Sequence, residues 1–395
     1  MKKFQVIYSY LLVYLLLLFQ AGFVFCELYS RYTNILLLLL TAIYMIAYKK
    51  KIAKATVLFS ITTIILQLVT FILKGFPELN LYLSTVVDVL TTAMIVSALD
   101  IKTFKTTFSN INFVICIASL IFYLLFIFNV PLSIFPVITS HSGTDAYFAF
   151  LTTSRMEWAN YRLQGIYWEP GAFQFFLIIS ALFDMYNREL PPWRRNMRFF
   201  VFLITIFLTY STTGIICSLF VATLYSYKFS RNPIIVISLF WGVIFFVIIG
   251  EMIIEGSFLY YSLFGKLSAL NDSLLYGESG NETADTRMGA VIYVMEEFIK
   301  SPIVGIGLSG HKALAQRGLN LTTFTPISLF AEYGIFLGSV HIVGLLKLMQ
   351  LRKKHIIEAS LVLVITILCT ISEQFAFNPI LMCLCLYGYI GCKVK

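Results

Sequence analysis

The sequence predicts a polytopic membrane protein built almost entirely from α-helices. Hydrophobic residues make up 59% of its 395 residues and charged residues only 12%, and the mean hydropathy is +0.86. Apolar runs of about 20 residues recur along the chain, which is the length of a helix that crosses a bilayer. The lysines and arginines lie in short clusters between these runs, as they do in proteins whose orientation is set by charge. A nucleic-acid-binding protein would gather them on one polar face, so the net charge of +9 does not indicate nucleic acid as a partner.

Twelve apolar runs, read with their polar flanks, are expected to cross the membrane and to unite residues 1–395 in one integral membrane domain. The first run follows Lys3 and lacks a small-x-small cleavage site, so we expect a retained span rather than a cleaved signal peptide. The expected spans are residues 5–26, 33–48, 55–73, 79–98, 111–130, 171–186, 199–210, 213–227, 233–253, 325–346, 356–372 and 376–391.

Charge decides how often the stretch 199–227 crosses, because its 29 residues are long for one span and short for two. Four arginines precede it within residues 188–198, and Lys228 and Arg231 follow it. Both basic flanks belong in the cytoplasm, and only an even number of crossings allows that. We therefore expect a shallow hairpin that turns at Ser211–Gly214.

The distribution of charge over the loops supports this topology. With the N-terminus inside, 20 of the 29 lysines and arginines fall on the cytoplasmic side, and both termini are cytoplasmic. Two loops on the opposite side are long, residues 131–170 and 254–324, and long loops between spans usually carry function. No internal repeat is visible, which counts against a transporter built from duplicated halves.

The seven cysteines lie in or beside apolar segments, and none forms a Cys-x-x-Cys pair. They are expected to be small buried apolar residues. The sequence therefore predicts neither a metal site nor a disulfide framework, and no cofactor.

A polar cluster lies where the first long loop enters the sixth span. Pro170 suits the first turn of a helix, so Glu169 falls at the N-cap, where a carboxylate can satisfy free backbone N–H groups. Arg162 lies three residues before Gly165 and carries a planar fork of donors that matches a pyrophosphate better than lysine does. Simple capping by Glu169 and contact of Arg162 with lipid phosphate are the alternatives.

The second long loop supplies another arginine. Residues Thr286–Lys300 are expected to form an amphipathic helix capped by Asp285, with Arg287 near its N-terminus, where anions are favoured. Arg162 and Arg287 together form a plausible clamp for a polyprenyl pyrophosphate, whereas a solvated or lipid-facing Arg287 is the alternative. His311 is the best placed of the four histidines to act as a base, although a lone histidine is more often a polar surface residue.

Two acids lie inside expected spans. Asp88 is near the middle of the fourth span, and buried acids in membranes are often functional, so a proton-coupled transporter must be considered. The hydroxyls of Thr85, Thr91 and Thr92 are its expected hydrogen-bond partners. Glu332 lies one to two turns into the tenth span, between Pro326 and two glycines.

Roughly residues 150–345 resemble the O-antigen polymerase and ligase superfamily, which includes Wzy-type polymerases and O-antigen ligases. Three short patterns, in this order, carry the resemblance, and the expected hairpin turn at Thr209–Gly214 is also similar to the family's. The patterns are Arg162-x-x-Gly165 with Glu169-Pro170-Gly171, then Arg287 leading into a helix followed by Ser301–Gly307, and then Phe330–Gly338.

The resemblance implies a metal-independent membrane glycosyltransferase of the GT-C type in the bacterial cytoplasmic membrane. It would take glycan from an undecaprenyl-pyrophosphate donor on the outer face, with membrane lipid and a chain-length regulator as further candidate partners. The matching arginines would hold the pyrophosphate and help it depart. The candidate catalytic residues are Arg162, Arg287, Glu169 and His311, and the candidate substrate-binding residues are Arg162, Gly165, Arg287, Gly305, Gly307 and Glu332.

One departure from the family bears on the reaction. Ligases carry a His-Asn pair about eleven residues before the glycine that matches Gly334, whereas this chain has Thr323-Phe324 there. This favours a polymerase of O-antigen, capsule or exopolysaccharide repeat units over a ligase. It also leaves His311, Glu169 or a substrate-assisted route as candidates for the base. The ligase is the first alternative, and a lipid-linked oligosaccharide flippase or proton-coupled carrier is the alternative from another class.

Overall fold

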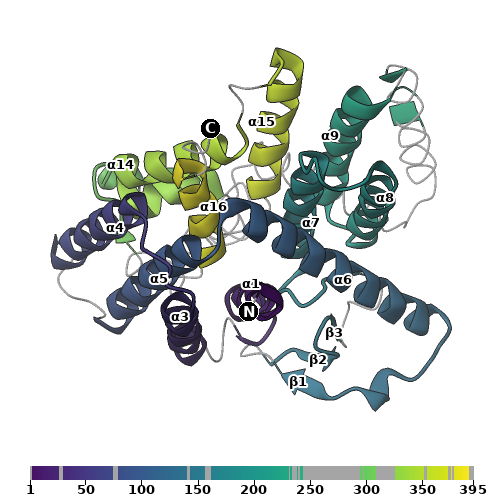
Figure 1. The fold of residues 1–395 in the computed structure, drawn as a ribbon, viewed down its shortest axis with the longest axis horizontal. Coiled ribbons are helices and arrows are strands. Elements are labelled where there is room, and N and C mark those ends of the chain that lie inside the picture. The colour runs from purple at the N-terminus through teal and green to yellow at the C-terminus, as the bar shows by residue number, and fades with distance from the viewer. Residues whose placement is uncertain are drawn as a thin grey trace, which may run out of the picture.

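A computed structural model describes most of the chain, and its described part is a bundle of α-helices (Figure 1). The described residues are 2–25, 30–73, 79–139, 143–155, 162–230, 232–233, 238, 241–242, 294–296, 298–307, 325–350, 354–371, 375 and 378–390. The helices named in this part are α1 (Lys2–Ala21), α3 (Ser30–Ala47), α4 (Lys54–Leu73), α5 (Leu79–Ala98), α6 (Ile101–Ile127), α7 (Pro170–Met185), α8 (Pro192–Leu208), α9 (Thr212–Phe229), α14 (Thr325–Leu348), α15 (Ile356–Ile371) and α16 (Pro379–Ile390).

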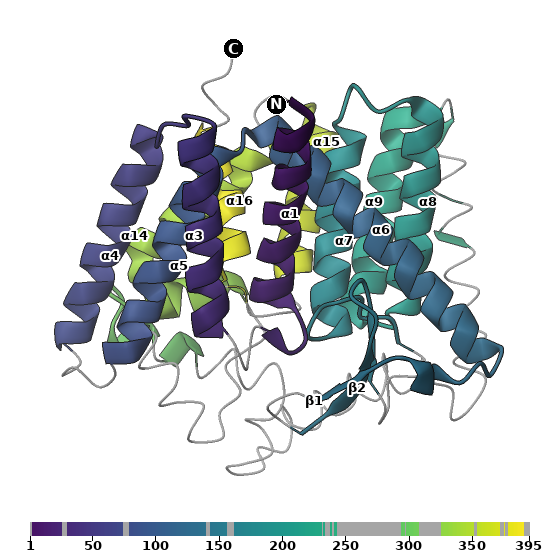
Figure 2. The same ribbon diagram turned by 60° about the horizontal axis from the view of Figure 1, so that its bottom comes forward.

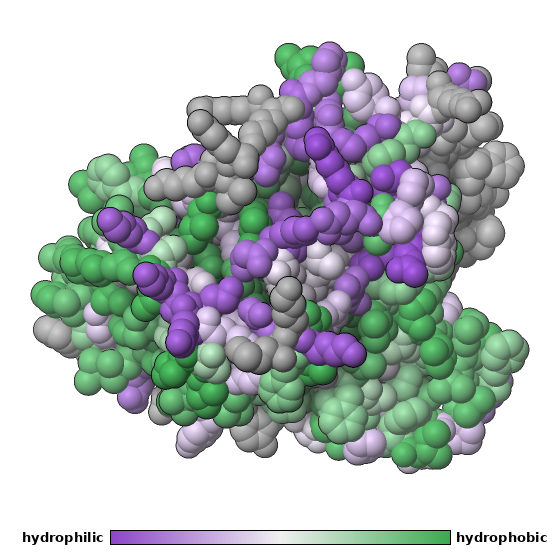
Figure 3. All heavy atoms as spheres, in the orientation of Figure 1, coloured by the Kyte–Doolittle hydropathy of each residue, from purple (hydrophilic) through white to green (hydrophobic). Residues whose placement is uncertain are grey.

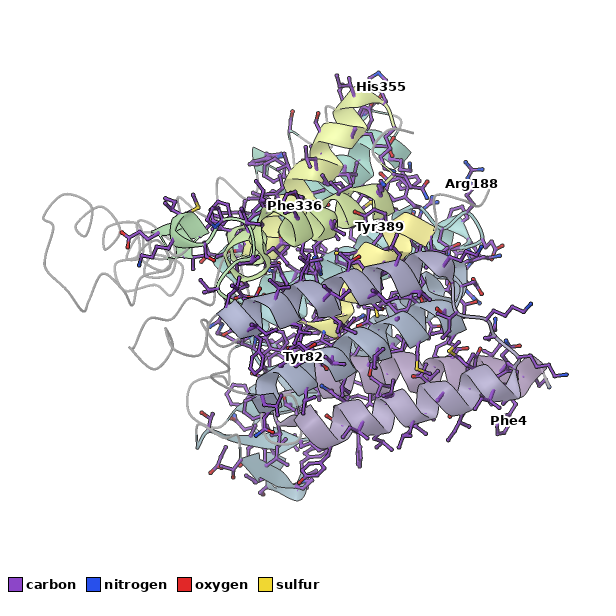
Figure 4. The ribbon with its side chains drawn as sticks, turned by 90° about the vertical axis from the view of Figure 1, so that its left-hand side faces the viewer. Phe4, Tyr82, Arg188, Phe336, His355 and Tyr389 are labelled. Carbon is purple, nitrogen blue, oxygen red and sulfur yellow. The ribbon has the colours of Figure 1, made fainter. Side chains whose placement is uncertain are left out.

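Most of these helices run between two ends of the molecule (Figure 2). One end carries the start of α1, the junction of α5 with α6 and the junction of α7 with α8, and most of the lysines and arginines of the described helices lie there. We call it the basic end. The other end, which we call the sheet end, carries the small β-sheet and the turn between α8 and α9 (Figure 2). Figure 4 labels Phe4 and Arg188 at the basic end and Tyr82 towards the sheet end.

Most helices match the expected spans. Eleven of the twelve expected spans overlap a named helix, although α6 begins at Ile101, ten residues before the expected span 111–130, and the remaining span, 233–253, lies almost wholly outside the described residues. Among the described residues, four helices, α1, α4, α6 and α14, are long and apolar enough to cross a membrane, and five more are shorter but apolar. The chain is therefore a largely helical, membrane-associated protein, whereas the count of twelve crossings stays a prediction.

The stretch 199–227 forms a hairpin of two helices, as expected, but its turn lies earlier in the chain than the expected Ser211–Gly214, and its depth in a membrane stays a prediction. The turn is at Thr209–Ser211, and Ser211 caps α9 by accepting a hydrogen bond from the Gly214 N–H at 3.3 Å. At 1.5 Å per residue, the 17 residues of α8 and 18 of α9 are each about 26 Å long. α8 begins at Pro192, before the expected residue 199, because proline suits the first turn of a helix, and its Arg198 pairs with Asp184 inside the bundle.

The first long loop departs from the all-α expectation because it holds a three-stranded antiparallel sheet. Strands β1 (Val137–Thr139), β2 (Asp145–Phe148) and β3 (Thr153–Arg155) pair in the order of the chain. Ala146 of β2 is fully buried and packs in one cluster with Phe23 and Val24, which follow α1. The sheet is thereby attached to the end of the first helix.

The core centres on α7 and α16. Every residue of α7 is buried, and so is α16 from Pro379 to Gly388. A helix that is apolar all round belongs in the interior of a bundle. Many apolar side chains of α1, α3 and α4 are exposed instead, and Figure 3 shows hydrophobic residues around the rim of the basic end with hydrophilic ones across its middle. That distribution suits lipid around the bundle and water at its end.

Candidate functional site

The segment 162–169 at the sheet end is held by three other parts of the chain. The Leu163 N–H donates to the carbonyl of Leu208 in α8, at 3.0 Å. The Trp168 N–H donates to the carbonyl of Ala21 in α1, at 3.1 Å. From β3, Thr153 donates to the Gly165 carbonyl both through its N–H, at 2.6 Å, and through its Oγ1, at 2.7 Å. The segment is therefore fixed to α1, α8 and the sheet.

Gly165 makes this arrangement possible. Its φ is +61°, a left-handed backbone conformation that glycine adopts without strain. A Cβ at this position would lie 2.9 Å from Cγ2 of Ile115 and 3.1 Å from the ring of Phe173. Both the turn and the close packing thus require glycine, so the conformation of Gly165 follows from packing, and its contact with substrate stays a prediction.

Arg162 is half-buried beside the turn between α8 and α9. Its Nε donates a hydrogen bond to the carbonyl of Thr209, the residue that ends α8, at 3.0 Å. Carbonyls at a helix C-terminus carry partial negative charge, so this bond fixes the orientation of the guanidinium. A guanidinium has four further N–H donors on its two Nη atoms, in the plane that suits phosphate oxygens.

Glu169 occupies the predicted N-cap position of α7, but the predicted capping bond is not formed. Its backbone is extended, with φ −157° and ψ 165°, and its side chain makes no capping hydrogen bond. Pro170 already fills the first helical position with a residue that has no N–H to satisfy. The half-buried carboxylate of Glu169 is therefore not committed to capping, which leaves its predicted chemical role open.

Gly305, Gly307 and Glu332 form a second group, built around a break in α14. Gly334 interrupts the helix with φ 72° and ψ 174°. In an unbroken helix the Ile335 N–H would donate to the Ala331 carbonyl. Here the Ile335 N–H donates to the carbonyl of Pro302 and the Ala331 carbonyl accepts from the Ile306 N–H, both at 2.8 Å. Segment 301–307 thus replaces the broken helical bond with two bonds of its own.

The glycines of this group let two backbones meet. Gly305 has φ +73°, and a Cβ there would lie 2.5 Å from the carbonyl oxygen of Glu332. A Cβ on Gly334 would lie 2.0 Å from the carbonyl oxygen of Ile303. Gly307, with φ +66°, packs against Thr70 of α4, whose Oγ1 donates to the Val304 carbonyl at 3.0 Å. Packing accounts for these glycines, and their contact with substrate stays a prediction. The same holds for Glu332, whose side chain is buried, with 2% of it exposed.

Phe375 links the two groups at the sheet end. Its ring lies 5.5 Å from that of Trp168, between centroids, and its N–H donates to Oγ1 of Thr325, the first residue of α14, at 2.9 Å. Nearby, Asn378 donates through Nδ2 to the carbonyl of Gln20 in α1, at 2.8 Å. Phe375 therefore connects segment 162–169 with the start of α14, the helix that carries Glu332.

Asp88 belongs to a polar network that the sequence did not reveal. Asn34 of α3 donates a hydrogen bond to Asp88 Oδ1, and Gln20 of α1 donates to Asn34 Oδ1. Two of the three threonines expected as partners are placed differently. Thr92 bonds the Pro379 carbonyl at 3.5 Å, and the buried Thr91 hydroxyl has no hydrogen-bond partner among the described residues. Single polar residues within apolar runs were the available signal for this network.

Two predicted site residues, Arg287 and His311, lie outside the described residues, so their positions relative to Arg162 stay predictions. Among the residues that the structure describes, no three His, Cys, Asp or Glu side chains are grouped as metal ligands would be. The described site thus holds one arginine, Arg162, and one carboxylate that is not used for capping, Glu169, on a segment fixed by backbone hydrogen bonds. No family model matches the chain, and neither a curated protein nor a solved structure is detectably similar to it.

Proposed function

We propose that the protein is a polysaccharide polymerase, a metal-independent GT-C-type glycosyltransferase that joins undecaprenyl-pyrophosphate-linked repeat units of O-antigen, capsule or exopolysaccharide. The observation that carries the proposal is the fixed segment 162–169, which holds Arg162 and Glu169 at the end of the bundle opposite the basic end. If the basic end faces the cytoplasm, as its positive charge favours, segment 162–169 faces outward, where lipid-linked repeat units are polymerised.

The proposed reaction is a glycosyl transfer. A hydroxyl of the terminal sugar on a fresh lipid-linked repeat unit attacks the anomeric carbon of the growing glycan. A new glycosidic C–O bond forms, and the bond from the anomeric carbon to the pyrophosphate oxygen breaks. The pyrophosphate leaves on its undecaprenyl carrier with the bonding electron pair, and the hydroxyl proton passes to a base. Negative charge therefore develops on the leaving pyrophosphate, where positioned cations accelerate such a step most.

Arg162 suits the leaving-group role. Its bond to the Thr209 carbonyl fixes the guanidinium beside a helix end, and a pre-oriented donor needs no rearrangement as charge develops. Glu169, seven residues along the same fixed segment, is the described candidate for the base because its carboxylate is not used for capping. Arg287 and His311 complete the proposed site as the second arginine and an alternative base.

A transport function is favoured by one observation, the network of Asp88 with Asn34 and Gln20 inside the helix bundle. The first experiment separates the candidates by deleting the gene in the native host and resolving the surface polysaccharide on a gel. A polymerase is expected to leave single repeat units on the final acceptor without the long ladder. Long chains stranded on undecaprenyl pyrophosphate would mean a ligase, and repeat units trapped on the cytoplasmic side a flippase. An unchanged ladder would exclude all three.

The role of Arg162 is tested in the deletion strain by complementation with Arg162→Ala, Arg162→Lys and, as control, Arg194→Ala, which removes an exposed arginine from the basic end. Loss of a donor that stabilises a leaving group costs about 100- to 1,000-fold in rate, so Arg162→Ala should abolish the ladder. Arg162→Lys should recover only part of it, because an ammonium lacks the planar fork. A normal ladder from Arg162→Ala at normal expression would refute the assignment.

A further inference from the structure

The basic end contains two adjoining cavities that the proposed reaction does not use. Their volumes are about 400 and 390 Å³, and they share five lining residues. The cavities lie among the start of α6, the end of α7 and the loop that follows it, and the first also reaches the ends of α9 and α14 and the start of α15. Figure 3 looks onto this end, where hydrophilic residues cross the middle of the face. The shared residues are Lys105, Phe183, Tyr186, Arg188 and Gln350.

Cations outnumber carboxylates in the larger cavity. Lys105, Arg188, Lys228 and Lys354 line it, and Glu358 is the one acidic residue among the lining residues. Glu358 already lies 2.9 Å from Lys228 Nζ and 3.7 Å from Lys354 Nζ, so a single carboxylate is shared by two lysines.

The smaller cavity adds no negative charge that could compensate this excess. Of its two acids, Asp184 is paired with Arg198 at 2.7 Å, and Glu189 with Lys102 at 2.5 Å. Both carboxylates are therefore neutralised by other cations. The excess positive charge of the combined cavity comes from Lys105 and Arg188, which line both parts, and from Lys228 and Lys354, which share the single carboxylate of Glu358.

Two lysines in the cavity lie against aromatic rings, and one of them, Lys354, also shares the carboxylate of Glu358. Lys105 Nζ lies 5.0 Å from the centroid of the Phe183 ring, and no ion pair is recorded for it within the described part of the chain. Lys354 Nζ lies 3.2 Å from the Tyr186 ring, and burial lowers the pKa of Lys354 to about 8. Such partly dehydrated cations are stabilised by an anion that enters the cavity.

We propose that this cavity binds the phosphate headgroup of an anionic phospholipid. Phosphate is the anion that clustered lysine and arginine side chains recognise, and basic pockets between helices at a membrane surface are characteristic sites for anionic headgroups. Lipid is favoured over a soluble phosphate because Leu182, Leu348 and Met349 line the same cavity beside the cations. Ile356 and Ile357 at the start of α15 are exposed beside it, as lipid-facing residues are.

The test uses the full chain purified in detergent and titrated with phosphatidylglycerol, phosphatidylcholine, inorganic phosphate or inorganic pyrophosphate, with binding followed by native mass spectrometry and by thermal unfolding. Phosphatidylglycerol is expected to bind and to raise the unfolding temperature, whereas phosphatidylcholine does not. Equal effects of the two lipids would overturn the proposal. Binding of inorganic phosphate or pyrophosphate without binding of phosphatidylglycerol would overturn it in favour of a soluble ligand.

Matched variants locate the binding site. Lys105→Met and Arg188→Gln each remove one cavity cation, and each should weaken phosphatidylglycerol binding about fivefold. Arg188 is exposed, so Arg188→Gln keeps the test valid even if Lys105→Met fails to fold (Figure 4). Lys347→Met is the control, because Lys347 is an exposed lysine of α14 that does not line either cavity. Unchanged binding to Arg188→Gln, or an equal loss in Lys347→Met, would refute the site.

Discussion

Two carboxylates inside the helix bundle, Asp184 and Asp88, are held in opposite ways. Asp184 is 5% exposed and forms an ion pair with Arg198 at 2.7 Å, and Ser109 donates to its other oxygen at 2.7 Å. Asp88 accepts a hydrogen bond from the neutral amide of Asn34, and no ion pair is recorded for it within the described residues. The first site requires a charge on the aspartate, whereas the second requires only an acceptor.

Both networks join helices that are distant in the sequence. Arg198 also donates to Asn110 of α6, which in turn donates to Tyr10 of α1, so the Asp184 network connects α1, α6, α7 and α8. The Asp88 network connects α5 with α3 and α1, and Asn378 extends it towards α16. The bundle thus joins its helices through one network with an ion pair, at Asp184, and one built on neutral amides, at Asp88, so the two networks should respond differently to the loss of charge.

The largest expected effect comes from Arg198→Met. Removing one partner of a buried ion pair leaves an uncompensated charge and typically costs about 3–5 kcal/mol of stability. The free energy of unfolding, measured by denaturation with SDS in mixed micelles, should fall by that amount. The control is the double variant Asp184→Asn, Arg198→Met, which removes both charges and should recover most of the loss. If the double variant were as unstable as Arg198→Met, the charge of Asp184 would not be the cause.

A smaller effect is expected from Asp88→Leu. This change removes the acceptor of the Asn34 amide and leaves a polar N–H unsatisfied inside the bundle, which costs about 1–3 kcal/mol. The same unfolding measurement applies, with Asp88→Asn as the matched control, because an asparagine at this position keeps an acceptor oxygen. If Asp88→Asn were as destabilising as Asp88→Leu, the negative charge of Asp88 would contribute to stability, and the Asp88 and Asp184 networks would not differ in this respect.

The sequence predicted the helices of the bundle but not the partners of its buried acids. Apolar runs predicted the helices because each run carries its own signal, and the position of Glu169 before Pro170 predicted the start of α7. The partners of Asp88 were sought among threonines on its own helix, yet Asn34 lies 54 residues away, and a sequence pattern does not contain such a contact. The arginines before residue 199 were expected to lie outside the span. Arg198 lies inside the bundle instead, and its pairing with Asp184 arises only in the folded protein.

The site shows the same limit. The glycines at positions 305, 307 and 334 marked irregular backbone in the sequence, but not the partner of that backbone. Only the structure shows that segment 301–307 supplies the two hydrogen bonds that replace the bond broken in α14. Likewise, the sequence placed Arg162 near the membrane boundary, whereas its bond to Thr209 depends on the hairpin of α8 and α9.

The smallest expected effect is that of Asp88→Asn on polymer synthesis. If Asp88 serves only as a hydrogen-bond acceptor, the Asn34 amide can donate equally well to the amide oxygen of an asparagine. The reacting groups on segment 162–169 then keep their positions. Complementation of the deletion strain with Asp88→Asn should then give a polysaccharide ladder of normal length and intensity. Asp88→Leu, matched for expression, shows how far the ladder depends on the stability of the bundle alone.

A lost ladder from a folded, normally expressed Asp88→Asn variant would mean that Asp88 does more than accept a hydrogen bond. The loss of one titratable proton would then abolish function although the hydrogen bond is kept, which is the behaviour of an intramembrane acid that carries protons. Repeat units trapped on the cytoplasmic side in the same strain would identify the step as transport and would refute the polymerase proposal. Repeat units delivered to the final acceptor without a ladder would instead place Asp88 among the residues that polymerisation requires.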